Sequence, residues 1–501
     1  MRKKRKTSAF NEYIETLTPA ENAQLESFFR ALKIKIGTNK KCRKELTQDF
    51  EKMFVYYYIN GKKLSEAIEI LSEENLGDFY SSTDNQTWFP LDNAAKIYPL
   101  IMNYNWMMIF RVSVYLKKEI VPCVLQMALD RTIKRFPYFA TTVKKGFFFH
   151  YLDGCNFRFA AEEERTLPCS GINLSKQDSR SLRVIYYKNR ISCEFFHLLT
   201  DGTGGMCFLK TLTAEYLKLT GEKIAYENDV LDINAPPEDA EAANDFPIAD
   251  APSKDKKKKN KSSDALQISG RRAFILPSRV LHFEFETDKL KSWAENEKAT
   301  VTELLVTLLF FACRHTIRKK INVDSCIQIQ VPVNMRNFYP SKTLRNFSMF
   351  CIIKIPYRNV MDFDSVLNEV KTQMKTGTSK SELDKSMAFA NNAVKNCKYI
   401  PLFIKKYLVR WGYNIIGEKN TTTTLSNLGV ASLPENMKNS VDKFDFVLGI
   451  PSRNKYNCSV VSYRDKTVLS LIKTIKNEEF ELYLKELLES RGIYPKIYGS
   501  K

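Results

Sequence analysis

The sequence has few histidines and no paired-cysteine motif. Only four histidines occur in 501 residues, and no two of the eleven cysteines have the C-x-x-C spacing. Zinc sites are usually built from closely spaced cysteines and histidines, so we expect no metal centre. Scattered cysteines are typical of reduced thiols, which behave as small buried hydrophobes in a cytoplasm. We therefore expect neither a disulfide framework nor an oxidising compartment.

The sequence also lacks a long apolar run. The longest one extends from Leu304 to Cys313 and is interrupted only by Thr307. A bilayer span needs about 20 apolar residues, so this run predicts a buried helix. The N-terminus is basic, with no apolar segment after it, and does not have the pattern of a secretory signal. A cytoplasmic protein is expected.

Positive charge is abundant: the formal net charge is +20. Part of it lies in three runs, at residues 2–6, 40–44 and 254–261. Such runs are either solvated lysine on loops and tails or a means of attracting an anionic lipid surface, a nucleic acid or a phosphorylated substrate. No zinc-finger or RNA-recognition motif is present, so no nucleic-acid partner is expected. Peripheral membrane contact through the basic segments remains an expectation.

Changes in composition divide the chain into four parts. Residues 1–85 have helical spacing, with a helix expected to begin at Pro19 behind Thr18 as its cap. Residues 86–224 and 271–501 interleave strand and helix patterns, which predicts a mixed α/β protein in two halves. Residues 225–270 lose all periodicity and carry acidic, alanine-proline and lysine runs. Such a composition predicts a disordered linker between the halves.

A hairpin followed by a helix is the clearest local pattern. Two apolar runs, 181–187 and 191–197, are joined by three polar residues, which predicts a β-hairpin. After Gly202 the apolar residues recur every three or four positions up to Leu219, as on a helix that packs against a sheet. Thr203 is the expected cap of that helix.

The turn between this hairpin and helix carries the candidate chemistry, His197-Leu-Leu-Thr-Asp201-Gly202. A neutral imidazole at the end of a strand can remove a proton from a hydroxyl, amine or thiol. Asp201 could orient that imidazole or fix the loop through an arginine, and Gly202 relieves crowding in the turn. The spacing alone leaves a second interpretation open, in which His197 is an ordinary core histidine and Asp201-Gly202 a simple turn.

The segment from Ser192 to Leu212 resembles the H-x-x-x-D-G signature of the chloramphenicol acetyltransferase-like superfamily. That superfamily includes condensation domains, plant acyltransferases, wax ester synthases and alcohol acetyltransferases, and the last are the most similar in character. Three further matches occur in the expected order, at 128–137, at 331–336 with 345–347 after it, and at 424–429. Arg345 stands where glycine is usual. The resemblance covers about residues 88–490 and leaves the N-terminal segment unexplained.

The resemblance implies two α/β subdomains with a channel between them and His197 midway along it. It implies that His197 is the general base, that Asp201 forms a structural ion pair with Arg336, and that Gly202 belongs to the same loop. Asn346, Ser426 and Asn427 are candidate oxyanion or substrate contacts. No bound cofactor or metal is implied. Acyl-CoA is the expected co-substrate and a small alcohol or amine the expected acceptor, with direct transfer of an acyl group, for which acetyl is the expected choice.

Two other functions remain open. The same fold could take its acyl group from a carrier-protein thioester, as condensation domains do, or could serve as a non-catalytic scaffold. The retained His197, Asp201, Gly202 and Arg336 argue against the scaffold. The chain has no G-x-S-x-G elbow and no phosphate-binding P-loop spacing, so neither a serine nucleophile nor nucleotide hydrolysis is expected.

Overall fold

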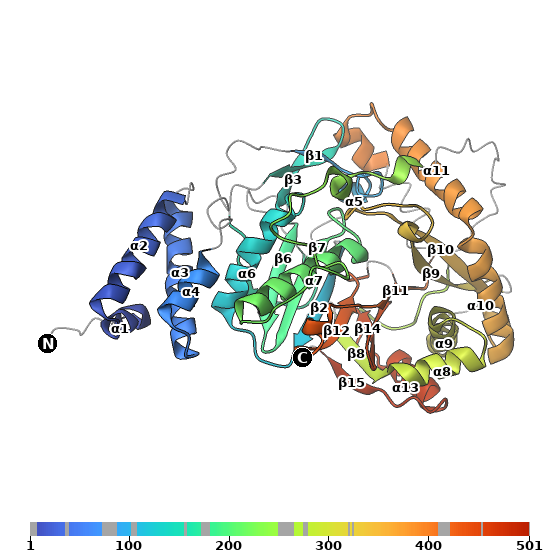
Figure 1. Cartoon of the computed structure of the whole chain (residues 1–501). Helices are drawn as coiled ribbons and strands as arrows, with labels where there is room; N and C mark the ends of the chain where they lie inside the picture. The colour runs from blue at the N-terminus through green and yellow to red at the C-terminus, as the bar shows by residue number, and fades with distance from the viewer. Residues whose placement is uncertain are drawn as a thin grey trace.

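The candidate catalytic turn lies at the end of a five-stranded sheet in the first half of the chain (Figure 1). The computed structural model describes residues 8–35, 40–72, 88–101, 108–154, 158–171, 181–248, 265–273, 279–318, 321–322, 325–408, 421–451 and 454–499. In this part of the chain no helix is long and apolar enough to cross a membrane. Nine cysteines have side chains that the structure describes, and these nine are free.

The first sheet has the strand order β12-β2-β7-β6-β5. The predicted hairpin is present, with Tyr187 opposite Arg190 across its turn. Two apolar-faced helices cover this sheet, and their side chains share one core with it. The bounds are β2 (Ile109–Leu116), β5 (Ala161–Glu163), β6 (Leu182–Tyr187), β7 (Arg190–Phe196), β12 (Val441–Val447), α6 (Pro122–Arg135) and α7 (Gly202–Leu219).

A seven-stranded sheet forms the second half, in the order β10-β9-β11-β13-β14-β8-β15. The apolar run predicted to be a buried helix is α9 (Val301–Thr316), which is packed within this half's core. The other bounds are β8 (Arg279–Glu286), β9 (Cys326–Asn334), β10 (Ser348–Pro356), β11 (Thr423–Val430), β13 (Tyr456–Tyr463), β14 (Lys466–Lys473), β15 (Lys496–Gly499), α8 (Thr287–Asn296), α10 (Phe363–Gly377), α11 (Lys380–Asn396) and α13 (Glu479–Glu489).

The second half contributes one strand to the sheet of the first half. β12 belongs by sequence to residues 271–501, yet it pairs with β2 of the first sheet, Phe446 lying opposite Val112. Its apolar residues are buried in the first-half core. Without β12, β2 would be an open edge of the first sheet. Pairing with β12 satisfies the backbone hydrogen-bonding groups of that edge, which is a physical reason for this arrangement. The predicted second subdomain therefore completes the sheet that carries His197.

The first half also contains a small three-stranded sheet, in the order β1-β4-β3. It consists of β1 (Phe89–Pro90), β3 (Thr141–Lys145) and β4 (His150–Gly154). β1 is followed by a turn and by the short helix α5 (Tyr98–Ile101), which matter for the site below.

The N-terminal segment is helical, and its helices pack against the first half (Figure 1). The predicted helix start is present: Glu21 accepts a hydrogen bond from the Thr18 backbone N–H at 2.9 Å, and Thr18 accepts one in return, which is a capping box. The Tyr57 hydroxyl donates to the Leu219 carbonyl at 2.9 Å. The bounds are α1 (Ala9–Glu15), α2 (Pro19–Lys35), α3 (Lys40–Ile59) and α4 (Leu64–Leu71).

Much of the segment predicted to be a disordered linker is ordered. Residues 225–248 include two short 3-10 helices, η2 (Asp239–Ala242) and η3 (Phe246–Ile248). Glu241 forms an ion pair with Arg135 at 2.5 Å, and Phe246 is buried beside Phe347. Residues 265–270 are also described, and 249–264 lie outside the described residues. The prediction was wrong for 225–248 because contacts with distant elements compensate for the low apolar content.

Candidate active site

His197 follows the last residue of β7 directly, in the turn that leads to α7. Its backbone N–H donates to the Met108 carbonyl at 2.7 Å, which continues the pairing of β7 with β2. The imidazole is half-buried between two aromatic rings, with its centroid 5.4 Å from that of Tyr98 and 5.2 Å from that of Phe110. The strand and the two rings therefore hold the ring at the end of the sheet.

A hydrogen bond from the second half determines which imidazole nitrogen carries the proton. His197 Nδ1 lies 2.9 Å from Asn346 Oδ1. The Asn346 amide nitrogen donates to Asp92 Oδ2 at 3.1 Å, and a carboxylate can only accept, so this contact fixes the orientation of the amide. The amide oxygen then accepts the Nδ1 proton. In neutral His197 this leaves the lone pair on Nε2, the form that a general base requires.

Asp92, which sequence reasoning missed, is the buried end of this chain of contacts. It follows β1 and accepts the Ala95 backbone N–H at 2.7 Å, a turn that the sequence Asp-Asn-Ala-Ala could have indicated. Burial raises the pKa of the Asp92 carboxyl, and the charge of Arg345 opposes that rise. The Arg345 Nε atom lies 3.8 Å from Asp92 Oδ2.

Arg345 occupies the position where the motif that this segment resembles usually has glycine, and its side chain is buried. The guanidinium donates to the carbonyl oxygens of Ala242, at 3.0 Å, and Pro90. It also lies over the Tyr138 ring, 4.7 Å from the centroid, a favourable cation–π contact. The departure from the motif is therefore accommodated by a counter-ion, Asp92, and by backbone acceptors from two separate segments.

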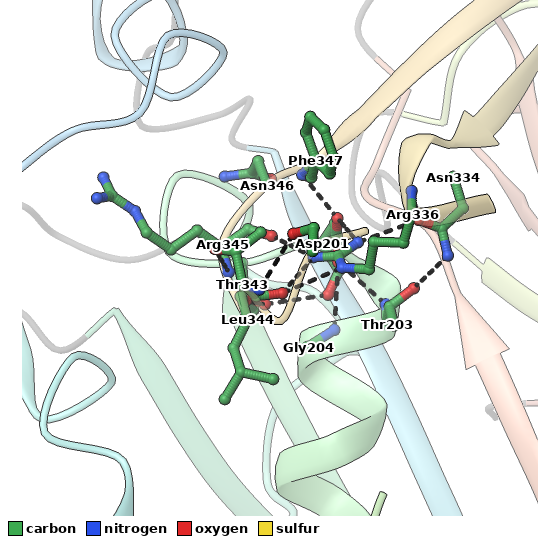
Figure 2. Close-up of polar contacts among 12 residues, drawn as sticks. Asp201, Thr203, Gly204, Asn334, Arg336, Thr343, Leu344, Arg345, Asn346 and Phe347 are labelled. Atoms are coloured by element: carbon green, nitrogen blue, oxygen red, sulfur yellow. Dashed lines mark hydrogen bonds and ion pairs between the residues drawn. The ribbon is translucent and has the colours of Figure 1, made fainter. Parts of the chain in front are cut away.

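Asp201 connects the start of α7 to the second half (Figure 2). Its Oδ1 atom accepts the backbone N–H groups of Thr203, at 3.1 Å, and Gly204, at 3.2 Å, so Asp201 itself is the N-cap. The expectation that Thr203 caps this helix was wrong, because α7 already begins at Gly202 and Thr203 lies within its first turn. Its Oδ2 atom accepts the Phe347 N–H at 2.9 Å.

The predicted ion pair between Asp201 and Arg336 is present, with Arg336 Nη1 2.8 Å from Asp201 Oδ2. The rest of the guanidinium donates to the Thr343 carbonyl, at 2.8 Å, and the Arg345 carbonyl, at 2.7 Å. One arginine therefore fixes both the catalytic turn and the loop that carries Asn346 (Figure 2). These contacts agree with a structural role for Asp201.

Two glycines let these segments approach closely. A Cβ atom on Gly202 would lie 2.4 Å from Leu428 Cδ2, and one on Gly204 would lie 2.1 Å from the Leu344 carbonyl oxygen. The second contact is with backbone, which cannot move aside as a flexible side chain can. Gly204 is therefore required for the loop of residues 343–347 to pack on α7, and Gly202 admits β11 beside the turn.

The three candidate oxyanion or substrate contacts have different surroundings. Asn346 is occupied by His197 and Asp92, so its position suits orienting the base. The Asn427 amide donates to Thr302 Oγ1 at 2.9 Å, and its oxygen accepts the Gly429 N–H at 2.7 Å, so it stabilises the end of β11. Ser426 is buried on the same strand. The amide contacts thus weaken the interpretation of Asn346 and Asn427 as oxyanion donors.

A second histidine, His282, lies between a serine and an aspartate as in a catalytic triad, but all three are buried. His282 Nδ1 lies 2.9 Å from Ser470 Oγ and its Nε2 lies 3.9 Å from Asp445 Oδ2. All three residues are buried and the Tyr498 ring stacks on the imidazole. Burial lowers the pKa of His282 to about 4, which keeps it neutral near pH 7. A nucleophile enclosed in this way has no room for a substrate, so we assign this group to packing.

The sequence matches no protein-family model, and no curated protein matches it in sequence at a significant level. Solved structures do match. Trichothecene 15-O-acetyltransferase TRI3 from Fusarium sporotrichioides superimposes with a TM-score of 0.56 at 13% identity, covering 82% of this chain and 95% of that chain. F. graminearum TRI101 with ethyl coenzyme A gives 0.55 at 10% identity, covering 82% and 100%. The starter condensation domain of rhizomide synthetase, with C8-CoA and Leu-SNAC, gives 0.53 at 11%, covering 81% and 94%.

These likenesses confirm the predicted α/β fold, that of the acetyltransferases and condensation domains in the suspected superfamily. The match covers most of the chain and nearly all of each compared structure. Identities of 10–13% establish the fold alone.

Proposed function

We propose that this protein is an acyltransferase that moves an acyl group from a CoA thioester to an alcohol or amine, with His197 as general base. One observation carries the proposal: His197 Nδ1 lies 2.9 Å from Asn346 Oδ1. With this oxygen as acceptor of the Nδ1 proton, the Nε2 lone pair is left for an incoming hydroxyl or amine. The histidine stands where the two halves of the fold meet, since Asn346 and Arg336 both come from the second half.

The proposed reaction is a direct transfer. The acceptor oxygen or nitrogen attacks the thioester carbonyl while His197 Nε2 takes its proton. The tetrahedral intermediate then collapses, the carbon–sulfur bond breaks, and the leaving thiolate receives the proton from the imidazolium. The products are the ester or amide and free CoA thiol. General-base catalysis contributes about 10²–10⁴-fold, and holding both reactants in line can contribute more. Acyl-CoA enters as co-substrate, and no resident cofactor or protein nucleophile takes part.

The compared structures support the choice of thioester. TRI101 is described with coenzyme A and deoxynivalenol, and the condensation domain with C8-CoA and Leu-SNAC. By analogy, a CoA donor and a small-molecule acceptor are proposed for this chain. The likeness to a condensation domain keeps a carrier-protein thioester as the second candidate donor. The free cysteines of the described residues agree with a reducing compartment, so the proposed location is the cytoplasm.

A thiol-release assay tests the function. The full-length protein is incubated with acetyl-CoA and longer acyl-CoAs, each with a panel of alcohols and amines, and CoA thiol is measured together with the acylated product. Acceptor-dependent thiol release with matching product supports the proposal. Turnover of acyl-pantetheine on a carrier protein, but not of acyl-CoA, would favour the condensation-type alternative. Binding of neither thioester would favour the scaffold.

The Asn346→Ala variant is expected to lower kcat about 5–100-fold while KM changes little, because an orienting hydrogen bond of about 1–3 kcal/mol is lost. The expectation rests on the contact of Asn346 with His197 Nδ1. The same substitution in a His197→Ala background should cost almost nothing more, since both residues act through one group. Asn391→Ala is the matched control, because this half-buried amide bonds Asn93 instead. Additive effects of the two active-site substitutions would contradict the positioning role.

A further inference from the structure

A short helix at residues 402–408 exposes its apolar side chains. Phe403 and Tyr407 are 65% and 76% exposed, and Ile404 and Leu408 beside them are also exposed. Residues four apart lie on one face of a helix, and neighbouring residues are about 100° apart around its axis. The pairs Phe403/Tyr407 and Ile404/Leu408 are therefore adjacent rows that together form one broad stripe. A surface helix of a soluble protein normally turns such a stripe toward the core.

The inward side of this helix is polar instead. Lys405 is only 1% exposed, and its ammonium group donates to the Phe148 carbonyl at 2.8 Å and lies over the Phe149 ring, 3.2 Å from the centroid. Burial lowers the pKa of Lys405, so this contact is made at a cost in desolvation. The helix is therefore anchored through a charged residue while its apolar stripe faces outward, the reverse of the usual arrangement.

The loop between β3 and β4 extends the stripe. Leu402 N–H donates to the Phe147 carbonyl at 2.9 Å, which joins the loop to the helix. Phe147 is 69% exposed and Tyr399 is 75% exposed. The Phe148 ring contacts both of them, with its centroid 4.8 Å from that of Phe147 and 6.4 Å from that of Tyr399. We call the whole surface the aromatic face; it consists of Phe147, Phe148, Tyr399, Phe403, Ile404, Tyr407 and Leu408.

Charge of one sign surrounds the aromatic face. From Lys385 to Leu408 the chain carries five lysines and neither aspartate nor glutamate. Lys395, Lys398 and Lys406 are exposed there, and Lys145 is exposed on the neighbouring strand β3. A patch of this composition attracts an anion, and its apolar residues favour a surface that can accept them out of water.

We infer that the aromatic face docks on an anionic lipid surface. Aromatic rings would enter the headgroup region while the lysines stay at the level of the lipid phosphates, the arrangement that amphipathic interfacial segments adopt. Lysine is depleted at protein–protein interfaces, which makes a protein partner a poorer fit to this patch. The inference does not depend on the proposed acyl transfer. It does not use the basic runs at 2–6 and 254–261, which lie outside the described residues.

Co-sedimentation of the full-length protein with vesicles tests this inference. One set of vesicles is phosphatidylcholine alone and the other contains phosphatidylserine as well. The wild type should bind the second set, more weakly at high salt, and bind the first set little. Each lysine next to an anionic surface strengthens binding about fivefold, so Lys398→Glu/Lys406→Glu should weaken it at least about 25-fold. Phe403→Ser/Tyr407→Ser should weaken it at least about tenfold, given the apolar area that these two rings would bury.

Two control variants make comparable changes at exposed positions elsewhere. Leu482→Ser/Tyr494→Ser removes two large apolar side chains, and Lys291→Glu/Lys476→Glu reverses the charge of two lysines. Both should bind like the wild type, and circular dichroism with thermal unfolding checks that all variants are folded. Failure of the wild type to bind anionic vesicles, or equal binding by the face variants, would overturn the inference. A wild-type dimer that Phe403→Ser/Tyr407→Ser makes monomeric would identify the face as a contact between copies of the chain instead.

Discussion

His197→Ala is expected to slow thiol release from acyl-CoA about 10²–10⁴-fold, with little change in KM for the thioester. The substitution removes the proposed general base and leaves the surrounding contacts nearly intact. Asn346 keeps its bond to Asp92, and the Tyr98 and Phe110 rings keep their backbone positions. Because the imidazole is only half-buried, the folded state should lose little stability. Steady-state rates and thermal unfolding of the two proteins are measured side by side.

The control for this experiment is His315→Ala. His315 is exposed and stacks on Tyr483 with 3.9 Å between ring centroids, far along the chain from the candidate turn. Its removal should leave the rate unchanged. Equal thiol release by His197→Ala and the wild type would reject the general base. It would leave the acyltransferase proposal standing only if product still formed in an acceptor-dependent way.

Asp201→Ala is expected to destabilise the protein by about 3–5 kcal/mol, because it leaves the largely enclosed Arg336 guanidinium, only 12% exposed, without its counter-ion. The carboxylate accepts hydrogen bonds from the start of α7 and from Phe347, and it pairs with Arg336 at 2.8 Å. Loss of the helix cap adds to the effect. The measurement is the free energy of unfolding from urea titration. Activity should fall as well, since the loop carrying Asn346 loses its connection to α7.

Asp362→Ala is the matched control. Asp362 also caps a helix, accepting the Ser365 N–H at 2.9 Å, but it forms no ion pair with an arginine of the described residues. Its removal should cost several-fold less stability. The double variant Asp201→Ala/Arg336→Met should be less destabilised than the two single variants added together, as expected for a coupled pair. Equal losses for the Asp201 and Asp362 variants would refute the account given for the ion pair.

The motif mismatch at Arg345 shows where sequence reasoning stopped. The flanking residues were sufficient to match the second-half segment, and the pairing of Arg336 with Asp201 followed from the resemblance. The sequence alone gives no reason for an arginine in place of glycine. Its explanation needs Asp92, Pro90 and Ala242, which are distant in sequence and which fold around the guanidinium. No local pattern could have identified them.

The elements themselves were mostly predictable, because helix and strand periods are local properties of the chain. The hairpin of β6 and β7, the helix α7 and the buried helix α9 all followed from spacing. Their partners did not. β12 joins the first sheet across most of the chain length, since pairing between distant strands depends on which edges remain open.

By itself the sequence determined the α/β class, the position of His197 after a strand, and a superfamily resemblance that placed Asp201 beside Arg336. These depend on periodicity and on short motifs. Only the tertiary structure decided which nitrogen of His197 is free, because that follows from Asn346 and Asp92 meeting it from two other segments. It also decided that Lys405 points inward and Phe403 outward, since the direction of a helix face depends on what the helix packs against.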